Sequence, residues 1–493
     1  MRGRGEIGRR RRLKIAFPWS AGSSPAVRTT LLALTLAACQ QQGATGPVRV
    51  VAIGAAPAMA DAARGTLGIS SRLLVDAVAQ GLVRFDAAGQ IEPGLAERWI
   101  VTDGGMSYIF RLRDARWRDG ATVTAEQVAA RLRRQVSAPR NPLAPFLSAI
   151  DEIVAMTPQV IEVRLKRPRP DLLKLFAQPE MALFLAKAGG SGPMTVAGRN
   201  PVVLRPSPDL DASSGTTAGD DVILTGARAG LAVARFLAGD ADLVAGGSVV
   251  DWPLVAAADP PAAAIRLDPA AGLFGLLIVR RDGFLADAGH RAALAQAFDR
   301  AAITGVASGW LPEERLLPEQ LDSAAAPQAP AWVVSTLDQR RAAARAVVAT
   351  WGQPVLVRIA LPEGPGATRL WRQLADGLRT IGVAAERVEM GATADLRLLD
   401  AVAPYDSARW YLASACRPCG GDALAKVLAA RDASTIAERA QRIAEADAAL
   451  ALDTAFIPLA RPLRWSLVAP GLRAWQPNAR AWHPLNHLRA APK

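Results

Sequence analysis

The chain has 493 residues, of which 51% are hydrophobic and 21% charged, with a formal net charge of +13. This length exceeds what one hydrophobic core organises, so we expect two or more lobes in an otherwise ordinary globular protein. Residues 1–38 hold eight Lys/Arg and one Glu, which leaves only +6 on the rest of the chain, and no basic patch is interleaved with aromatic residues. The charge therefore gives no reason to expect a nucleic-acid partner.

An export signal is predicted near the N-terminus. Arg28 precedes a short apolar run, residues 29–38, which ends in small residues before Cys39. The run is far shorter than the ~20 residues that span a bilayer, so a transmembrane helix is disfavoured. Leu-Ala-Ala-Cys at its end resembles a bacterial lipobox, and we expect Cys39 to be acylated, the alternative being an accidental cysteine.

This signal divides the N-terminal region. We expect a leader over residues 1–38 and a polar tether over residues 39–46. Residues 1–27 are poor signal material, whereas initiation at Val27 would give a compact lipoprotein signal. We therefore expect translation to start there.

Strand and helix signals follow in the next part of the chain. Residues 48–53 predict a strand and residues 72–82 a helix. Residues 108–113 and 161–166 alternate apolar with polar side chains, the period of a half-buried strand. Between them, Thr124-Ala-Glu-Gln has the spacing of a capping box and predicts a helix start.

The order of these signals resembles the extracellular solute-binding proteins of ABC importers, in particular the large peptide/nickel-binding family. Residues 81–128 carry GLVRFD, PGLAE, a Trp, DGG and VTAEQV in the order that the family has them. The similarity covers roughly residues 73–303. Three further segments match the family pattern: residues 190–193 (GSGP), 236–243 (FLAGDADL) and 291–300 (RAALAQAFDR).

The resemblance implies an α/β, two-lobed periplasmic-binding-protein fold of the large type. It places lobe 1 at residues 47–270, with an inserted subdomain at about 72–190. Lobe 2 would cover residues 271–465, and residues 466–493 would return to lobe 1.

Sequence patterns add elements outside the matched segments. We expect a loop at residues 143–147, a short helix at 171–177, an exposed excursion at 206–220 and a buried strand at 272–279 that carries the chain between the lobes. An Ala/Pro-rich connector at residues 322–330 precedes alternating helices and strands, typical of α/β layering. The predicted helices are 339–350, 367–381 and 435–450, and the predicted strands are 355–360 and 385–390.

Cys416 and Cys419 form a CxxC pair. In an oxidising compartment an even pair favours a disulfide. Free thiols and redox or zinc chemistry remain open, although neither a preceding strand nor two further zinc ligands are evident nearby.

The usual signatures of catalysis are missing from the sequence. The chain has three histidines, His290, His483 and His487, and no GxSxG, HExxH or P-loop motif. Its GxGxxG match lies in the basic leader, without a strand before it. We therefore expect no enzyme activity, no cofactor and no metal site.

A cluster of an acid, a guanidinium and two rings is the best candidate for binding a solute. It consists of Tyr405, Asp406, Arg409 and Trp410, and Trp252 is a further aromatic candidate. In peptide-binding relatives an acidic group of this region pairs with the amino terminus of the ligand, a role that the resemblance gives to Asp406.

The function implied is capture of a peptide-like or other small solute between two lobes, followed by delivery to the permease of an ABC importer. We expect a monomeric, lipid-anchored periplasmic protein of a Gram-negative bacterium. The alternative is an envelope lipoprotein that uses the same fold for sensing or protein interaction.

Overall fold

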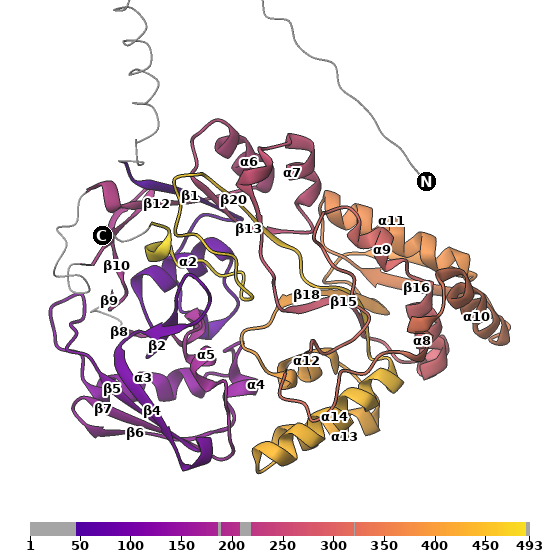
Figure 1. The fold of residues 1–493 in the computed structure, drawn as a ribbon, viewed down its shortest axis with the longest axis horizontal. Helices are drawn as coiled ribbons and strands as arrows, with labels where there is room; N and C mark the ends of the chain where they lie inside the picture. Colours follow the sequence, from indigo (N-terminus) through magenta and orange to yellow (C-terminus); the bar gives the residue numbers. More distant parts are fainter. Residues whose placement is uncertain (1–45, 186–188, 208–217, 320, 490–493) are drawn as a thin grey trace, which may run out of the picture. The chain divides into compact units, whose positions relative to one another are not determined.

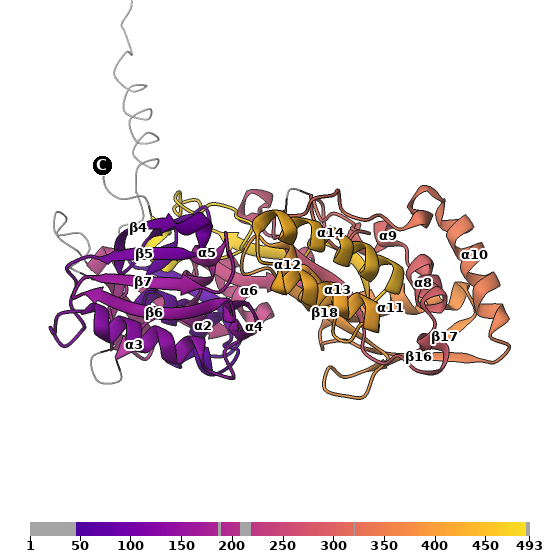
Figure 2. The same cartoon turned by 90° about the horizontal axis from the view of Figure 1, so that it is seen from below.

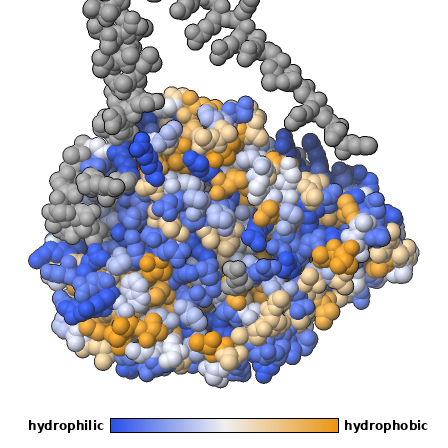
Figure 3. Space-filling view, in the orientation of Figure 1, coloured by the Kyte–Doolittle hydropathy of each residue, from blue (hydrophilic) through white to orange (hydrophobic). Residues whose placement is uncertain are grey.

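The structure is a computed structural model that describes residues 46–489 apart from 186–188, 208–217 and 320. Cys39 and the leader lie outside the described residues, as do parts of the predicted tether and excursion. No helix within the described ranges combines the length and the apolar run that crossing a bilayer requires. On the face drawn in Figure 3, apolar residues form separate patches among hydrophilic ones.

A seven-stranded mixed sheet is the centre of what we call the first lobe (Figure 1). Its central strand, β1, pairs in parallel with β12 and β13, and Val50 and Ala52 of β1 are fully buried. Helices α2 (Ile69–Val78) and α6 (Ala229–Leu237) pack against β1, and α7 (Trp252–Ala258) packs against α6. In spatial order the strands are β10 (Met194–Arg199), β11 (Val202–Pro206), β12 (Val222–Ala227), β1 (Val48–Ile53), β13 (Leu243–Ser248), β20 (Arg464–Val468) and β14 (Ile265–Leu267).

A four-stranded antiparallel sheet lies between β1 and β10 in the chain, and Figure 2 shows its strands one above the other. Helix α3 (Ala125–Val136) packs against it, and the predicted capping box is confirmed: Thr124 and Gln127 exchange side-chain to backbone bonds of 3.4 Å. Gln127 also accepts a bond of 2.8 Å from the Trp117 indole, which fixes the turn before the helix. The strands are β4 (Ala96–Thr102), β5 (Ser107–Leu112), β7 (Val160–Leu165) and β6 (Ile150–Thr157), and the neighbouring short elements are β2 (Val83–Phe85), β3 (Ile91–Pro93), β8 (Phe184–Leu185), β9 (Gly189–Gly190) and α5 (Leu172–Phe176).

A five-stranded sheet is the centre of what we call the second lobe. Its strand β15 (Gly272–Ile278) is buried from Leu273 to Ile278, because it lies between two antiparallel neighbours under a layer of helices. The strands in spatial order are β17 (Val383–Val388), β16 (Val355–Ala360), β18 (Leu396–Val402), β15 and β19 (Phe456–Ala460). The helices are α8 (Ala288–Ala297), α9 (Arg300–Thr304), α10 (Leu337–Thr350), α11 (Pro365–Thr380), α12 (Ala408–Ala415), α13 (Gly421–Asp432) and α14 (Ile436–Asp453).

The chain passes from one sheet to the other between β14 and β15 and returns between β19 and β20. The residues after β20 are held against the first of these passages. Asp268 accepts a bond of 2.9 Å from the amide of Asn478 and lies 3.1 Å from Nε2 of His483, all three side chains being buried. These contacts fix the C-terminal segment beside the passage between the sheets.

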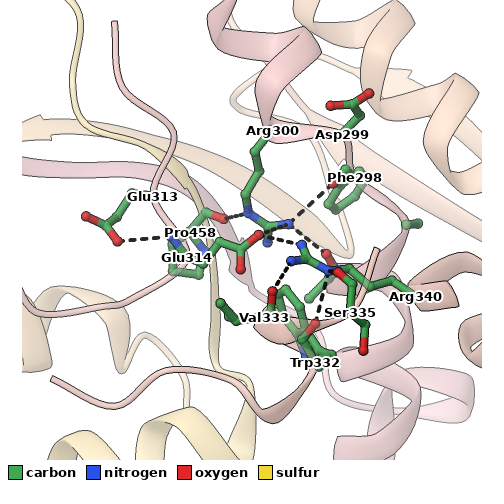
Figure 4. Close-up of polar contacts among 12 residues, drawn as sticks. Phe298, Asp299, Arg300, Glu313, Glu314, Trp332, Val333, Ser335, Arg340 and Pro458 are labelled. Atoms are coloured by element: carbon green, nitrogen blue, oxygen red, sulfur yellow. Dashed lines mark hydrogen bonds and ion pairs between the residues drawn. The ribbon is translucent and has the colours of Figure 1, made fainter. Parts of the chain in front are cut away.

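The connector before α10 is fastened to the second lobe by a cluster of cations around one ring (Figure 4). The guanidinium groups of Arg300 and Arg340 lie over the Trp332 ring, at 5.2 and 5.0 Å from its centre. The Glu314 carboxylate lies 2.6 Å from Arg340 and 3.7 Å from Arg300, whose side chain is only 4% exposed. Earlier in the connector, the amide of Gln328 donates a bond of 2.8 Å to Asp447 of α14.

Two local predictions were wrong. Residues 143–147, expected as a loop, contain a four-residue helix, α4 (Ala144–Leu147), whose Phe146 and Leu147 are buried. Helix α2 begins and ends three to four residues before the predicted range 72–82. After its last residue, Val78, the backbone of Ala79 is extended, and Gly81 lies so close to the backbone of Phe176 that no side chain fits there.

Candidate ligand cleft

A cavity of about 440 Å³ is lined by both lobes and by the C-terminal segment. The first lobe contributes α2, the loop before α4 and the residues after α5. The second lobe contributes the end of β18, α12 and the loop after it. In such a position, between the two large sheets, a solute would touch both lobes at once.

One wall of the cavity is built around Trp482, at the chain's C-terminal end. The guanidinium of Arg72 lies over its ring at 5.1 Å, and the indole N–H donates to half-buried Asp76 at 3.2 Å. Burial raises the pKa of Asp76 to about 6, while the bond from Trp482 acts in the opposite direction. Arg72 also lies 3.4 Å from the carboxylate of Glu180, which lines the same cavity.

Asp406 lies beside this cavity with a cation on each side. It pairs with Lys174 of α5 and with Arg480 of the C-terminal segment. Arg480 lines the cavity, is 5% exposed and donates at 2.5 Å to the carbonyl of Ala403. Burial lowers the pKa of Arg480 to about 10. Both cations come from segments remote in the sequence, so Asp406 joins three parts of the chain.

The other members of the predicted cluster have different positions. Trp410 lines the cavity, is 6% exposed and meets Tyr411 edge to face at 5.0 Å. Arg409 points away, with its guanidinium over Phe146 at 5.8 Å and a bond of 3.1 Å to a first-lobe carbonyl. Tyr405 is 1% exposed and packs on the same Phe146 at 5.5 Å. These two side chains join the lobes beneath the cavity.

Trp252 lies in a different place. It lines a cavity of about 180 Å³ between α7, α9 and α11, donates at 2.8 Å to the carbonyl of Val306 and meets Trp465 edge to face at 6.5 Å. The structure therefore does not bring Trp252 together with the cluster around Asp406.

The loop after α12 closes another side of the cavity. The structure joins Cys416 and Cys419 by a disulfide, with their Cα atoms 4.7 Å apart. Arg417, within this loop, lines the cavity. Its Nε donates at 3.3 Å to the carbonyl of Ala413, and no carboxylate among the described residues pairs with it. The disulfide thus restrains the loop that carries an unpaired cation.

The histidines lie apart from one another and from this cavity. His290 stacks on Phe284 at 4.3 Å, His483 contacts Asp268, and His487 lies 2.7 Å from Glu92. Within the described part of the chain, no group of three or more His, Cys, Asp or Glu side chains is arranged to hold a metal ion.

Sequence reasoning missed several lining residues: Arg72, Glu180, Arg417, Arg480 and Trp482. The first two belong to unremarkable local patterns and carry no signal of their own. The C-terminal segment did carry one, since Trp475, Arg480 and Trp482 concentrate rings and a cation in a short stretch without helical or strand periodicity.

Comparisons with known proteins agree with this arrangement. The family described as "Bacterial extracellular solute-binding proteins, family 5 Middle" matches residues 90–400. The probable deoxycholate-binding periplasmic protein YgiS of Escherichia coli K12 is 31% identical over 121 residues, 21% of this chain and 23% of that protein. The periplasmic oligopeptide-binding protein OppA of Haemophilus influenzae is 36% identical over 85 residues, 17% of this chain and 16% of that protein. These alignments thus span about a fifth of the length of the curated relatives.

The fold similarity extends much further than the sequence similarity. The crystal structure of H. influenzae OppA superimposes with a TM-score of 0.74 at 19% identity, over 90% of this chain and 98% of that one. The E. coli murein tripeptide binding protein MppA gives a TM-score of 0.76 at 19% identity with the same coverage. The chain therefore has the α/β, two-lobed fold of the periplasmic binding proteins.

Proposed function

Since this chain belongs to the bacterial extracellular solute-binding proteins of family 5, we propose that it captures a small solute between its two lobes and delivers it to the permease of an ABC importer. The observation that carries the proposal is the cavity of about 440 Å³, lined by both lobes and by the C-terminal segment. Relatives are named for solutes as different as deoxycholate and an oligopeptide, so membership of the family leaves the solute open.

Capture without reaction follows from the groups that line the cavity. They are cations, one carboxylate and aromatic rings, which bind and orient a solute. A solute that contacts both lobes stabilises the closed arrangement, in which the lobes meet around it. The size of this effect is set by how much more tightly the solute binds the closed arrangement than the open one. The permease would then recognise the lobes in this arrangement.

The remaining parts of the proposal concern the location and organisation of the protein. Acylation of Cys39 would anchor a monomer to a membrane facing the periplasm of a Gram-negative bacterium, with residues 39–46 as the tether. Lobe 1 would comprise residues 47–270 and the segment 466–493, and lobe 2 residues 271–465. The passages on either side of the second sheet support this division.

The test is native mass spectrometry of the protein purified without denaturation, which should reveal a co-purified solute. Titration with that solute then compares Trp410→Phe with Trp252→Phe, two tryptophans of similar exposure, 6% and 8%, that line different cavities. The first change should weaken binding by roughly two- to tenfold, equivalent to ~0.5–1.5 kcal/mol of aromatic contact, and the second should not. Equal affinities in both variants, or the absence of any bound solute, would contradict capture in this cavity.

A further inference from the structure

The ionic side chains that line the cavity are mostly positive. Arg72, Arg417 and Arg480 line it together with a single carboxylate, that of Glu180. A guanidinium remains charged at neutral pH even when partly buried. The cavity wall therefore carries an excess of positive charge.

The acids near the cavity are already engaged by partners within the protein: two by cations and one by an indole N–H. Glu180 is 8% exposed and pairs with Arg72 at 3.4 Å. Asp406 is held between Lys174 and Arg480. Asp76 lies behind Trp482 and accepts the indole N–H. An ammonium group on a solute would have to displace one of these partners, whereas an anion would not.

One of the cations retains unused donors that a solute can reach. Arg417 is exposed, and its described hydrogen bond goes to a backbone carbonyl at 3.3 Å, which leaves the two terminal nitrogens of its guanidinium for a ligand. Planar guanidinium groups bind carboxylates and phosphates through paired hydrogen bonds, so these donors suit an oxyanion.

The rest of the wall is apolar. Phe85, Phe146, Trp410 and Trp482 line the cavity together with aliphatic side chains of β15 and β18. These surfaces suit a ring or a branched hydrocarbon.

We propose that the cavity selects organic anions, solutes with an apolar body and a carboxylate or phosphate group, over solutes whose only charge is an ammonium. Arg417 binds the anionic group at the mouth of the cavity, the disulfide between Cys416 and Cys419 holds its loop in place, and the aromatic wall binds the apolar body. Asp406 serves to fix Arg480 instead of receiving an amino group from the solute. This inference rests on the proposed capture function and names its substrate class.

The first arm of the experiment is calorimetric titration of the full chain with three probes of one shape. These are N-acetyl-phenylalanylleucine, which is an anion, its neutral C-terminal amide, and the amide without the acetyl group, which is a cation. The anion should bind at least about tenfold more tightly than the neutral amide, the effect of one charge-assisted hydrogen bond, and the cation should bind more weakly still. A cation that binds as tightly as the anion overturns the inference.

The second arm uses Arg417→Gln, with Arg473→Gln as the control, because Arg473 is an exposed arginine outside the lining of the cavity. The first variant should remove most of the preference for the anion and leave the neutral amide unaffected, while the control keeps the parent's preference. An unchanged preference in Arg417→Gln overturns the role of Arg417. Replacing the probe's carboxylate with a phosphate ester shows which oxyanion the site prefers.

Failure of the inference and failure of the capture function are distinguishable. If the co-purified solute found by native mass spectrometry is cationic or neutral, or if the probes bind in the opposite order, capture stands and anion selection is overturned. If no solute co-purifies and none of the three probes binds, both are overturned.

Discussion

Asp447 should make the stability of the protein depend on pH through a single buried carboxyl group. It is 2% exposed, accepts one bond of 2.8 Å from the Gln328 amide, and its Oδ1 has no partner. Burial raises its pKa from 3.8 to about 6, and the bond from Gln328 only partly opposes this.

The sign and size of the effect follow from the two pKa values. Between pH 3.8 and about 6 the folded protein holds a proton that the unfolded chain has released, so the free energy of unfolding falls as the pH rises through this window. The difference between these two pKa values corresponds to ~3 kcal/mol of stability, which is fully lost above about pH 6. In Asp447→Asn the side chain cannot ionise, so this loss should disappear.

The assay is urea denaturation of the parent and of Asp447→Asn from about pH 4.5 to 7.5. Over this range the difference between the two free energies of unfolding should change by ~2 kcal/mol in favour of the variant as the pH rises. Any free-energy cost of burying an amide in the variant is the same at every pH, so it does not affect this change with pH. The other acids are present in both proteins, so their contributions cancel in the difference. Asp422→Asn, at an exposed position of α13, is the control and should leave the pH dependence unchanged. Parallel curves for the parent and Asp447→Asn would refute the reasoning.

Three other predictions concern the fastening of the connector, the disulfide and the anchor. Glu314→Gln removes the carboxylate beside two guanidinium groups and should lower the free energy of unfolding, measured by urea denaturation, by ~3 kcal/mol. The control, Glu319→Gln, breaks an exposed ion pair and should lower it by less than ~1 kcal/mol. Equal losses in the two variants would contradict the role of burial. Cys416 and Cys419 should resist alkylation in periplasmic protein until a reductant is added, and full labelling without reductant would rule out the disulfide. Cys39→Ser should abolish acylation, because the thiol is the acyl acceptor, and membrane fractionation identical to that of the parent would disprove the anchor.

Sequence patterns correctly predicted elements that are stabilised by residues close together in the chain. The capping box at Thr124 works through atoms three residues apart, and the alternation at residues 161–165 records one buried face of β7. The continuous apolar run of β15 likewise reflects the burial of both faces of that strand. In each case the pattern of burial or hydrogen bonding can be recognised in the residues of the element itself.

Patterns failed where distant parts of the chain decide the outcome. Gly81 lies against the backbone of Phe176, and nothing in the sequence near residue 81 indicates that contact. The cavity wall depends on several contacts between residues that are distant in the sequence. Asp406 meets Lys174 and Arg480, and Trp482 meets Asp76, so the sequence identified the region around Trp410 without revealing its partners.

The bond between Trp482 and Asp76 joins residues 406 positions apart and has a consequence for the order in which the protein matures. Every strand of both sheets has been synthesised once the ribosome passes Val468, but the wall formed by Arg480 and Trp482 is still missing. Contacts of such long sequence separation form late, because the whole intervening chain must first be closed into a loop. A chain that ends at Val468 would therefore contain the residues of every strand of both sheets and lack the part of the cavity wall formed by Arg480 and Trp482. If the cavity captures a solute as proposed, an incomplete chain lacks part of the site that would hold it.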